Sequence, residues 1–137
     1  MGRKLSILLL VVLALTVTAC GKPRMVTTID MEKAQIDLSE YCKHFPTSKS
    51  VGEMYICDVT CDGIDDVVTS VTYGNNNTHS AIVVYDVYNE DYYTLDGEYF
   101  GYSILKVDKD CLFVIEDDST KGTVGFEENE LVFIANN

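Results

Sequence analysis

The chain has 137 residues, and its 22 acidic and 10 basic side chains give a formal net charge of −12 at pH 7. A surface this acidic repels phosphate backbones, which excludes nucleic acid as a partner. Apolar residues make up 47% of the sequence, so we expect a folded core rather than a disordered acidic chain.

The first twenty residues have the pattern of an export signal. Arg3 and Lys4 form a short positive segment, and residues 5–15 are almost entirely apolar. A run of this length is too short for a mature membrane-spanning helix and suits a secretory signal. It leads into Val17–Cys20 (VTAC), which resembles the lipobox of bacterial lipoproteins. The resemblance implies cleavage before Cys20, diacylation of that cysteine, and an exported domain that the lipid anchors to the cell membrane, facing outside the cytoplasm.

Cleavage at this point would leave one domain. Removal of residues 1–19 leaves 118 residues, enough for a single compact domain, and takes the formal charge to −14 because two basic residues are lost. We expect a signal peptide over 1–19, a lipidated tether over 20–29 and a single β-rich domain over 30–137. The alternatives are an ordinary secretory signal cut near Ala19 and an uncleaved anchor.

A helix is expected at the start of the domain. Asp30 can cap its first turn, and Pro46 ends it because proline cannot continue a helix. The apolar positions between them recur every three or four residues and form one face, made up of Ala34, Leu38, Tyr41, Cys42 and Phe45.

From Met54 onward, short runs of β-branched and aromatic residues alternate with turn residues. Strands are expected over 54–57, 67–73, 80–88, 92–95, 99–107, 111–116, 122–127 and 130–135. Close spacing without crossover helices predicts an antiparallel meander. The run 81–85 is apolar on both faces, which predicts a sheet covered by the helix on one side and by later strands on the other. The expected fold is mainly β (α+β), with an N-terminal helix and a blade-like or sandwich-like meander.

The segment between the first two strands has the spacing of a calcium loop. Oxygen-bearing side chains stand at positions 1, 3, 5 and 9, which are Asp58, Thr60, Asp62 and Asp66. Gly63 at position 6 permits a sharp turn, and Ile64 at position 7 can offer its backbone carbonyl. Position 12 is Thr69 rather than a bidentate glutamate, and strands flank the loop, so this is not an EF-hand.

This loop resembles the calcium loops of FG-GAP and VCBS-type repeats, over about residues 54–90 and as a single repeat. The resemblance implies that Asp58, Thr60, Asp62, Asp66 and the Ile64 carbonyl bind calcium and that an apolar strand follows. The alternative is an acidic β-turn, in which the loop aspartates accept hydrogen bonds from nearby backbone amides and no metal is held.

Acylation of Cys20 would leave four other cysteines, which are Cys42, Cys57, Cys61 and Cys111. An even number in a small exported domain predicts up to two disulfides, with three ways of pairing. The alternatives are buried thiols and a zinc site built from Cys42, Cys57, Cys61 and His44.

The sequence contains no nucleophile elbow, zinc-protease helix motif or phosphate-binding glycine loop. Paired acids at Glu116–Asp118 and Glu127–Glu128 are an alternative acid–base set. His44 and His79 are isolated, which favours capping or surface roles. Six tyrosines stand in the strand region and either fill the sheet or contact a protein or carbohydrate ligand: Tyr85, Tyr88, Tyr92, Tyr93, Tyr99 and Tyr102.

These observations favour a non-enzymatic lipoprotein that displays a small calcium-binding β domain at the membrane, for ligand binding or envelope structure. One alternative is a carboxylate-based hydrolase or the accessory domain of one. Another is an acidic inhibitor or chaperone-like partner of a basic exported protein.

Overall fold

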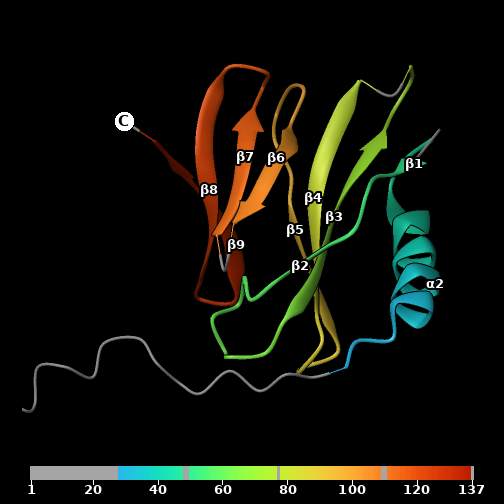
Figure 1. The fold of residues 1–137 in the computed structure, drawn as a ribbon. Coiled ribbons are helices and arrows are strands. Elements are labelled where there is room, and N and C mark those ends of the chain that lie inside the picture. The colour runs from blue at the N-terminus through green and yellow to red at the C-terminus, as the bar shows by residue number, and fades with distance from the viewer. Residues whose placement is uncertain (1–27, 48–49, 77, 109–110, 137) are drawn as a thin grey trace, which may run out of the picture.

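The computed structural model describes residues 28–47, 50–76, 78–108 and 111–136. One helix and two antiparallel sheets form three layers, with the first sheet between the helix and the second sheet (Figure 1). The described part of the chain is therefore mainly β with one short helical segment near its start, as the sequence predicted. Within the described ranges, no helix has both the length and the apolar character needed to cross a membrane.

The helical segment forms as its sequence predicts. Helix α2 spans Met31–Tyr41, and a single 3₁₀ turn, η1, continues over Cys42–His44. The Asp30 side chain caps α2 by accepting a hydrogen bond from the Lys33 amide at 3.0 Å. Phe45 is extended because the residue before a proline is disfavoured in the helical region, and this ends the segment.

The first sheet is built around two long central strands. It contains β1 (Ser50–Val51), β2 (Tyr55–Cys57), β3 (Asp66–Tyr73), β4 (His79–Asp86) and β5 (Asp91–Leu95). The short strands β1 and β2 both pair with β3, one after the other, and β3, β4 and β5 follow as hairpins. The β2–β3 connection therefore lies at one end of this sheet.

The second sheet is a four-stranded meander. It contains β6 (Tyr102–Asp108), β7 (Cys111–Glu116), β8 (Thr120–Glu127) and β9 (Glu130–Ala135), paired in chain order. The β7–β8 and β8–β9 turns each place two residues at positive φ, Asp117 and Asp118 in one and Glu128 and Asn129 in the other. Such pairs are typical of tight hairpin turns whose twist matches that of the strands.

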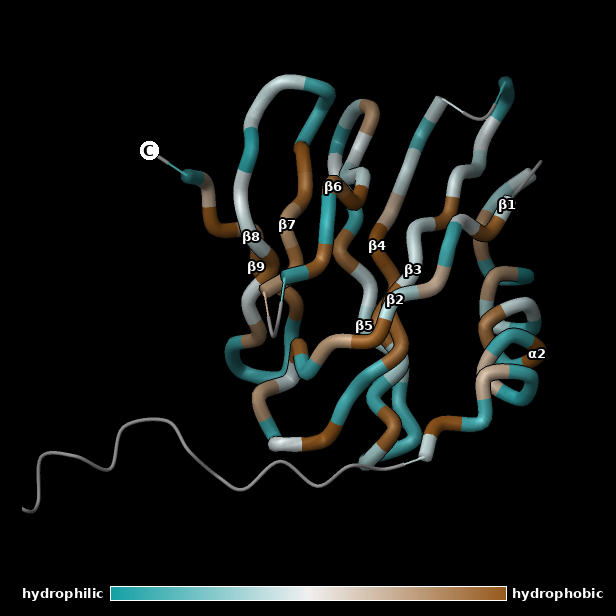
Figure 2. The backbone as a smooth tube through the Cα atoms, viewed as in Figure 1, coloured by the Kyte–Doolittle hydropathy of each residue, from teal (hydrophilic) through white to brown (hydrophobic). Residues whose placement is uncertain are grey.

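Both faces of the first sheet are buried, as the apolar run 81–85 predicts. One core lies between the two sheets and includes Val68, Ile82 and Val84. The other lies beneath the helix, where Leu38 packs with Val83 and their neighbours. Figure 2 shows the hydrophobic residues along β3 and β4 between these layers.

The structure differs from the expected strands in several places, and three of these differences have local reasons. Strand β6 begins at Tyr102 rather than at 99, because Gly101 adopts φ +79° beside Ser80. Strand β4 ends at Asp86 rather than at 88. The Asp86 carboxylate accepts hydrogen bonds from the Tyr88 and Asn89 amides, and these bonds form a turn. Strand β1 was not expected, since a two-residue strand is defined only by its pairing with β3.

Candidate functional site

The candidate calcium loop joins β2 to β3, and both of its ends are fixed. Cys57 and Asp66 face each other as the last pair of the β2–β3 ladder, so the loop closes tightly between them. Cys61 and Gly63 have positive φ values, 58° and 92°. Gly63 therefore occupies the sharp turn that the sequence predicts at position 6.

Two of the predicted ligands fold the loop by accepting hydrogen bonds from its own amides. Asp58 accepts from the Asp62 amide at 3.2 Å and from the Gly63 amide at 3.0 Å. Asp62 accepts from the Ile64 amide through Oδ1 at 2.8 Å. These bonds hold the carboxylates on the inner side of a compact turn. They are the bonds that the acidic-turn interpretation predicts.

Asp66, the predicted ligand at position 9, is fully buried. Its Oδ2 accepts from the Val59 amide at 2.9 Å, the Thr60 amide at 3.0 Å and the Thr60 hydroxyl at 3.2 Å. Burial raises the pKa of the Asp66 carboxyl to about 7; the Thr60 and Val59 hydrogen bonds oppose this, and the charge of Asp86 adds to it. The ionised form of Asp66 is therefore costly in this fold.

Asp86 is a second buried carboxylate, which was not among the predicted site residues. Since Val67 pairs with Tyr85, the register of β3 and β4 brings Asp86 beside Asp66. Asp86 is 1% exposed, and its oxygens accept from the Tyr88 amide and from the backbone and side-chain nitrogens of Asn89. The sequence did mark Asp86 as an acid at the end of an apolar strand and before a turn. At such positions Asp commonly accepts hydrogen bonds from the backbone amides that follow it.

Two buried carboxylate oxygens of the loop have no hydrogen-bond partner within the described part of the chain, Asp62 Oδ2 and Asp66 Oδ1. A buried polar atom without a partner costs about 1–3 kcal/mol, and more when it is charged. A cation that both oxygens approached would remove this cost. The predicted metal ligands of the loop are all oxygen atoms. Such a set fits a hard cation such as calcium and not zinc.

The carboxylates are not drawn together around a common point. Among the described residues, no group of three or more His, Cys, Asp and Glu side chains is placed to hold a metal ion. The loop amides hold Asp58 and one oxygen of Asp62, as given above. Calcium binding therefore requires the partnerless oxygens of Asp62 and Asp66 to converge, and it stays a prediction.

The predicted cysteine sites are spread over the fold. Cys57 belongs to the core between the sheets and Cys42 to the core beneath the helix, so the first sheet separates them. Cys61 and Cys111 are exposed. This separation argues against a zinc site shared by Cys42 and Cys57. No disulfide is formed within the described residues, and disulfides in the exported protein stay a prediction.

Two of the alternative acid–base residues accept hydrogen bonds within the fold. Glu116 accepts a hydrogen bond from the Tyr102 hydroxyl at 2.7 Å, and Asp117 accepts from the Gly101 amide at 2.9 Å. Glu127 and Glu128 lie exposed at the β8–β9 turn. His79 bonds Asp96 at 2.7 Å, and the same carboxylate accepts from the Tyr73 hydroxyl.

The predicted tyrosines divide into two groups. Tyr85 and Tyr102 are buried and Tyr92 and Tyr93 are half-buried, so these fill the sheets. Tyr88 and Tyr99 are 66% and 71% exposed, in the connections after β4 and β5.

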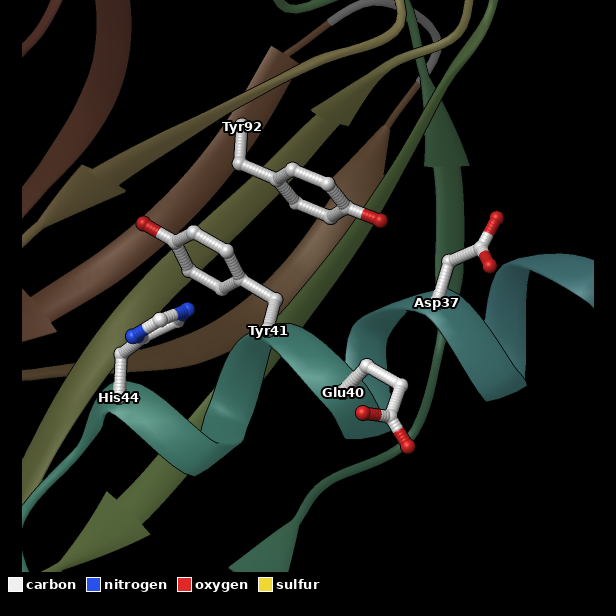
Figure 3. A pocket seen from close by; sticks show the side chains of 5 residues that line it. All are labelled: Asp37, Glu40, Tyr41, His44 and Tyr92. Atoms are coloured by element: carbon white, nitrogen blue, oxygen red, sulfur yellow. The ribbon is translucent and has the colours of Figure 1, made fainter.

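A shallow pocket, lined in part by Tyr92, lies between α2 and β5 (Figure 3).

The predicted lipid site, Cys20, lies outside the described residues, as do the signal peptide and most of the tether.

No protein-family model, curated protein or solved structure matches this chain.

Proposed function

We propose that this protein is a non-enzymatic lipoprotein that holds a small calcium-binding β domain at the outer side of the cell membrane, where it binds a ligand or supports the envelope. The single observation that carries the calcium part is the pair of buried, partnerless oxygens on Asp62 and Asp66. They belong to two of the residues that the loop spacing assigns as ligands. The anchor part rests on the sequence Val17–Cys20.

The charges of the site support a cation at this position. Asp58, Asp62 and Asp66 repel one another in a chain whose net charge is already −12, and Asp86 adds a further buried carboxylate beside them. A divalent cation would neutralise this repulsion and fasten the β2–β3 connection. Thr60 and the Ile64 carbonyl would complete an all-oxygen ligand set. With three carboxylates, the Kd should fall at about 10⁻⁴ to 10⁻³ M, the range of extracellular calcium modules.

Calcium should raise the melting temperature of the purified protein. A ligand that binds only the folded state adds RT ln(1 + [L]/Kd), which is about 1.4 kcal/mol at millimolar calcium and a Kd of about 10⁻⁴ M. For a domain of this size that is a rise of several degrees. Thermal unfolding with calcium, with magnesium and with chelator measures it. Magnesium should substitute poorly because it demands a small octahedral shell.

Matched variants separate a bound ion from a general effect of salt. Asp62→Asn keeps an oxygen for the Ile64 amide and removes one ligand charge, so it should abolish the response to calcium. Asp65→Asn makes the same chemical change at position 8, which is not a predicted ligand, and should keep the response. If the two variants respond alike, or if calcium leaves the wild-type melt unchanged, the loop is only an acidic turn.

Replacement of Cys20 tests the anchor. If Cys20 carries the lipid, Cys20→Ser should abolish incorporation of a fatty-acid probe in growing cells and leave an uncleaved precursor or a released form. Cys111→Ser, a change at an exposed cysteine of the domain, should leave labelling intact. Labelling of Cys20→Ser at the wild-type level would contradict the lipoprotein assignment.

A further inference from the structure

The pocket between α2 and β5 has a cavity volume of about 350 Å³ and opens to solvent. Five side chains line it: Asp37, Glu40, Tyr41, His44 and Tyr92. Four come from the last turns of the helical segment and one from the edge strand β5 (Figure 3). The pocket thus combines acidic groups with an aromatic wall.

The aromatic wall is held rigidly. The Tyr41 and Tyr92 rings stack with centroids 4.5 Å apart and an interplanar angle of 10°. Tyr92 also stacks on Tyr85, and the Tyr41 hydroxyl bonds the Thr94 hydroxyl at 2.8 Å. These contacts fix the position of the Tyr41 ring, which lines the pocket, and alkyl chains and organic cations both bind aromatic rings.

Asp37 and Glu40 are the acidic side chains of the pocket. The Tyr92 hydroxyl points toward Asp37 in Figure 3. Burial, followed by the charge of Asp37, raises the pKa of Tyr92 to about 12, so its hydroxyl stays neutral. The Lys33 ammonium already donates to Asp37 Oδ2 at 2.7 Å, so a ligand ammonium would share this carboxylate with Lys33 or displace it.

The ion pairs at the rim are weak competitors for a ligand. In the pair of Lys43 with Glu40 both side chains are 64% exposed, and in the pair of Lys33 with Asp37 they are 62% and 31% exposed. Exposed pairs of this kind contribute only about 0–1 kcal/mol. A cation that also contacts the aromatic wall can therefore share or displace them. The net charge of −12 adds a long-range attraction for cations.

We propose that this pocket binds an alkylammonium group, with the ammonium beside Asp37 and the Tyr92 hydroxyl and the alkyl chain along the Tyr41 ring. Glu40 and His44 close the rim around it. The ligand chemistry is that of a lysine side chain on a partner protein or of a free polyamine. This site is independent of the calcium loop, none of whose residues line the pocket.

Titration of the purified protein with chelator present tests the proposal. The probes are Nα-acetyl-lysine amide and putrescine, and Nα-acetyl-norleucine amide is the neutral analogue of the first. Saturable binding of at least one amine, with a Kd of about 1 mM or tighter, is expected by calorimetry or amide NMR. The amine that binds more tightly identifies the source of the ligand. The neutral analogue should not bind, because it lacks the charge that Asp37 pairs with.

Variants locate the binding in the pocket. Asp37→Asn should weaken the affinity about tenfold, the typical value of a hydrogen bond to a charged group. Glu32→Gln is the matched control, since Glu32 is exposed on the same helix and outside the pocket, and it should leave the affinity unchanged. Equal loss in both variants would mean diffuse attraction to an acidic surface and would overturn the proposal. So would binding of the neutral analogue, or no saturable binding of either amine.

Discussion

In calcium-free buffer with chelator, the protein should become less stable as the pH rises from about 4 to about 7. Asp66 has its folded-state pKa raised from 3.8 to about 7, mainly by burial. Between these values the folded state binds more protons than the unfolded state, so the free energy of unfolding falls with increasing pH and levels off above about 7. The contribution of Asp66 is a few kcal/mol, with about 4 kcal/mol as its upper bound.

Comparison with variants isolates this carboxyl from the other acids of the chain. Asp66→Asn removes the titrating group and leaves an oxygen to accept from Val59 and Thr60, so its stability should vary less with pH than that of the wild type. Asp65→Asn should follow the wild-type profile. Denaturant unfolding at a series of pH values measures all three proteins. Parallel profiles for wild type and Asp66→Asn would show that Asp66 titrates normally.

Gly101→Ala should be among the most destabilising single substitutions in the domain. Gly101 has φ +79°, and a Cβ at this position would overlap the carbonyl of Ser80, where the chain crosses from one sheet to the other. The left-handed backbone costs a non-glycine residue about 1–2 kcal/mol. The collision with backbone adds to it, so we expect a loss of roughly 3–5 kcal/mol in the free energy of unfolding.

Gly74→Ala separates the two causes. Gly74 has a similar φ of +87°, but a Cβ there would meet no atom within 4 Å. This variant should therefore show only the backbone cost of about 1–2 kcal/mol. Chemical denaturation of both variants gives the comparison. Equal losses would mean that the contact with Ser80 relaxes freely and that the crossing between the sheets is not tightly packed.

Much of the fold was predictable because its determinants are local. Asp30 and Pro46 bound the helical segment, and the three-to-four-residue spacing predicts the face on which Ala34 and Leu38 are buried. Apolar residues on both faces of 81–85 predict the middle position of the first sheet. Gly101 was misassigned because its conformation depends on a contact with Ser80 that is distant in sequence.

The site was predictable only in part. The loop spacing correctly predicts the turn at Gly63 and brings Asp58 and Asp62 onto one compact loop. The buried partner Asp86 was missed because only the β3–β4 register places it beside Asp66. The pocket formed by Asp37 and Tyr92 was missed for the same reason, since it depends on how α2 docks against β5.

Amide NMR of the purified protein during a calcium titration tests the central claim most directly. The Gly63 amide donates to Asp58, and the Val59 and Thr60 amides donate to Asp66, so all three report on the predicted ligands. The account predicts saturable shifts of these amides with a midpoint at about 10⁻⁴ to 10⁻³ M calcium, and none in Asp62→Asn. Unmoved loop amides, or linear shifts spread over every acidic surface, would contradict it.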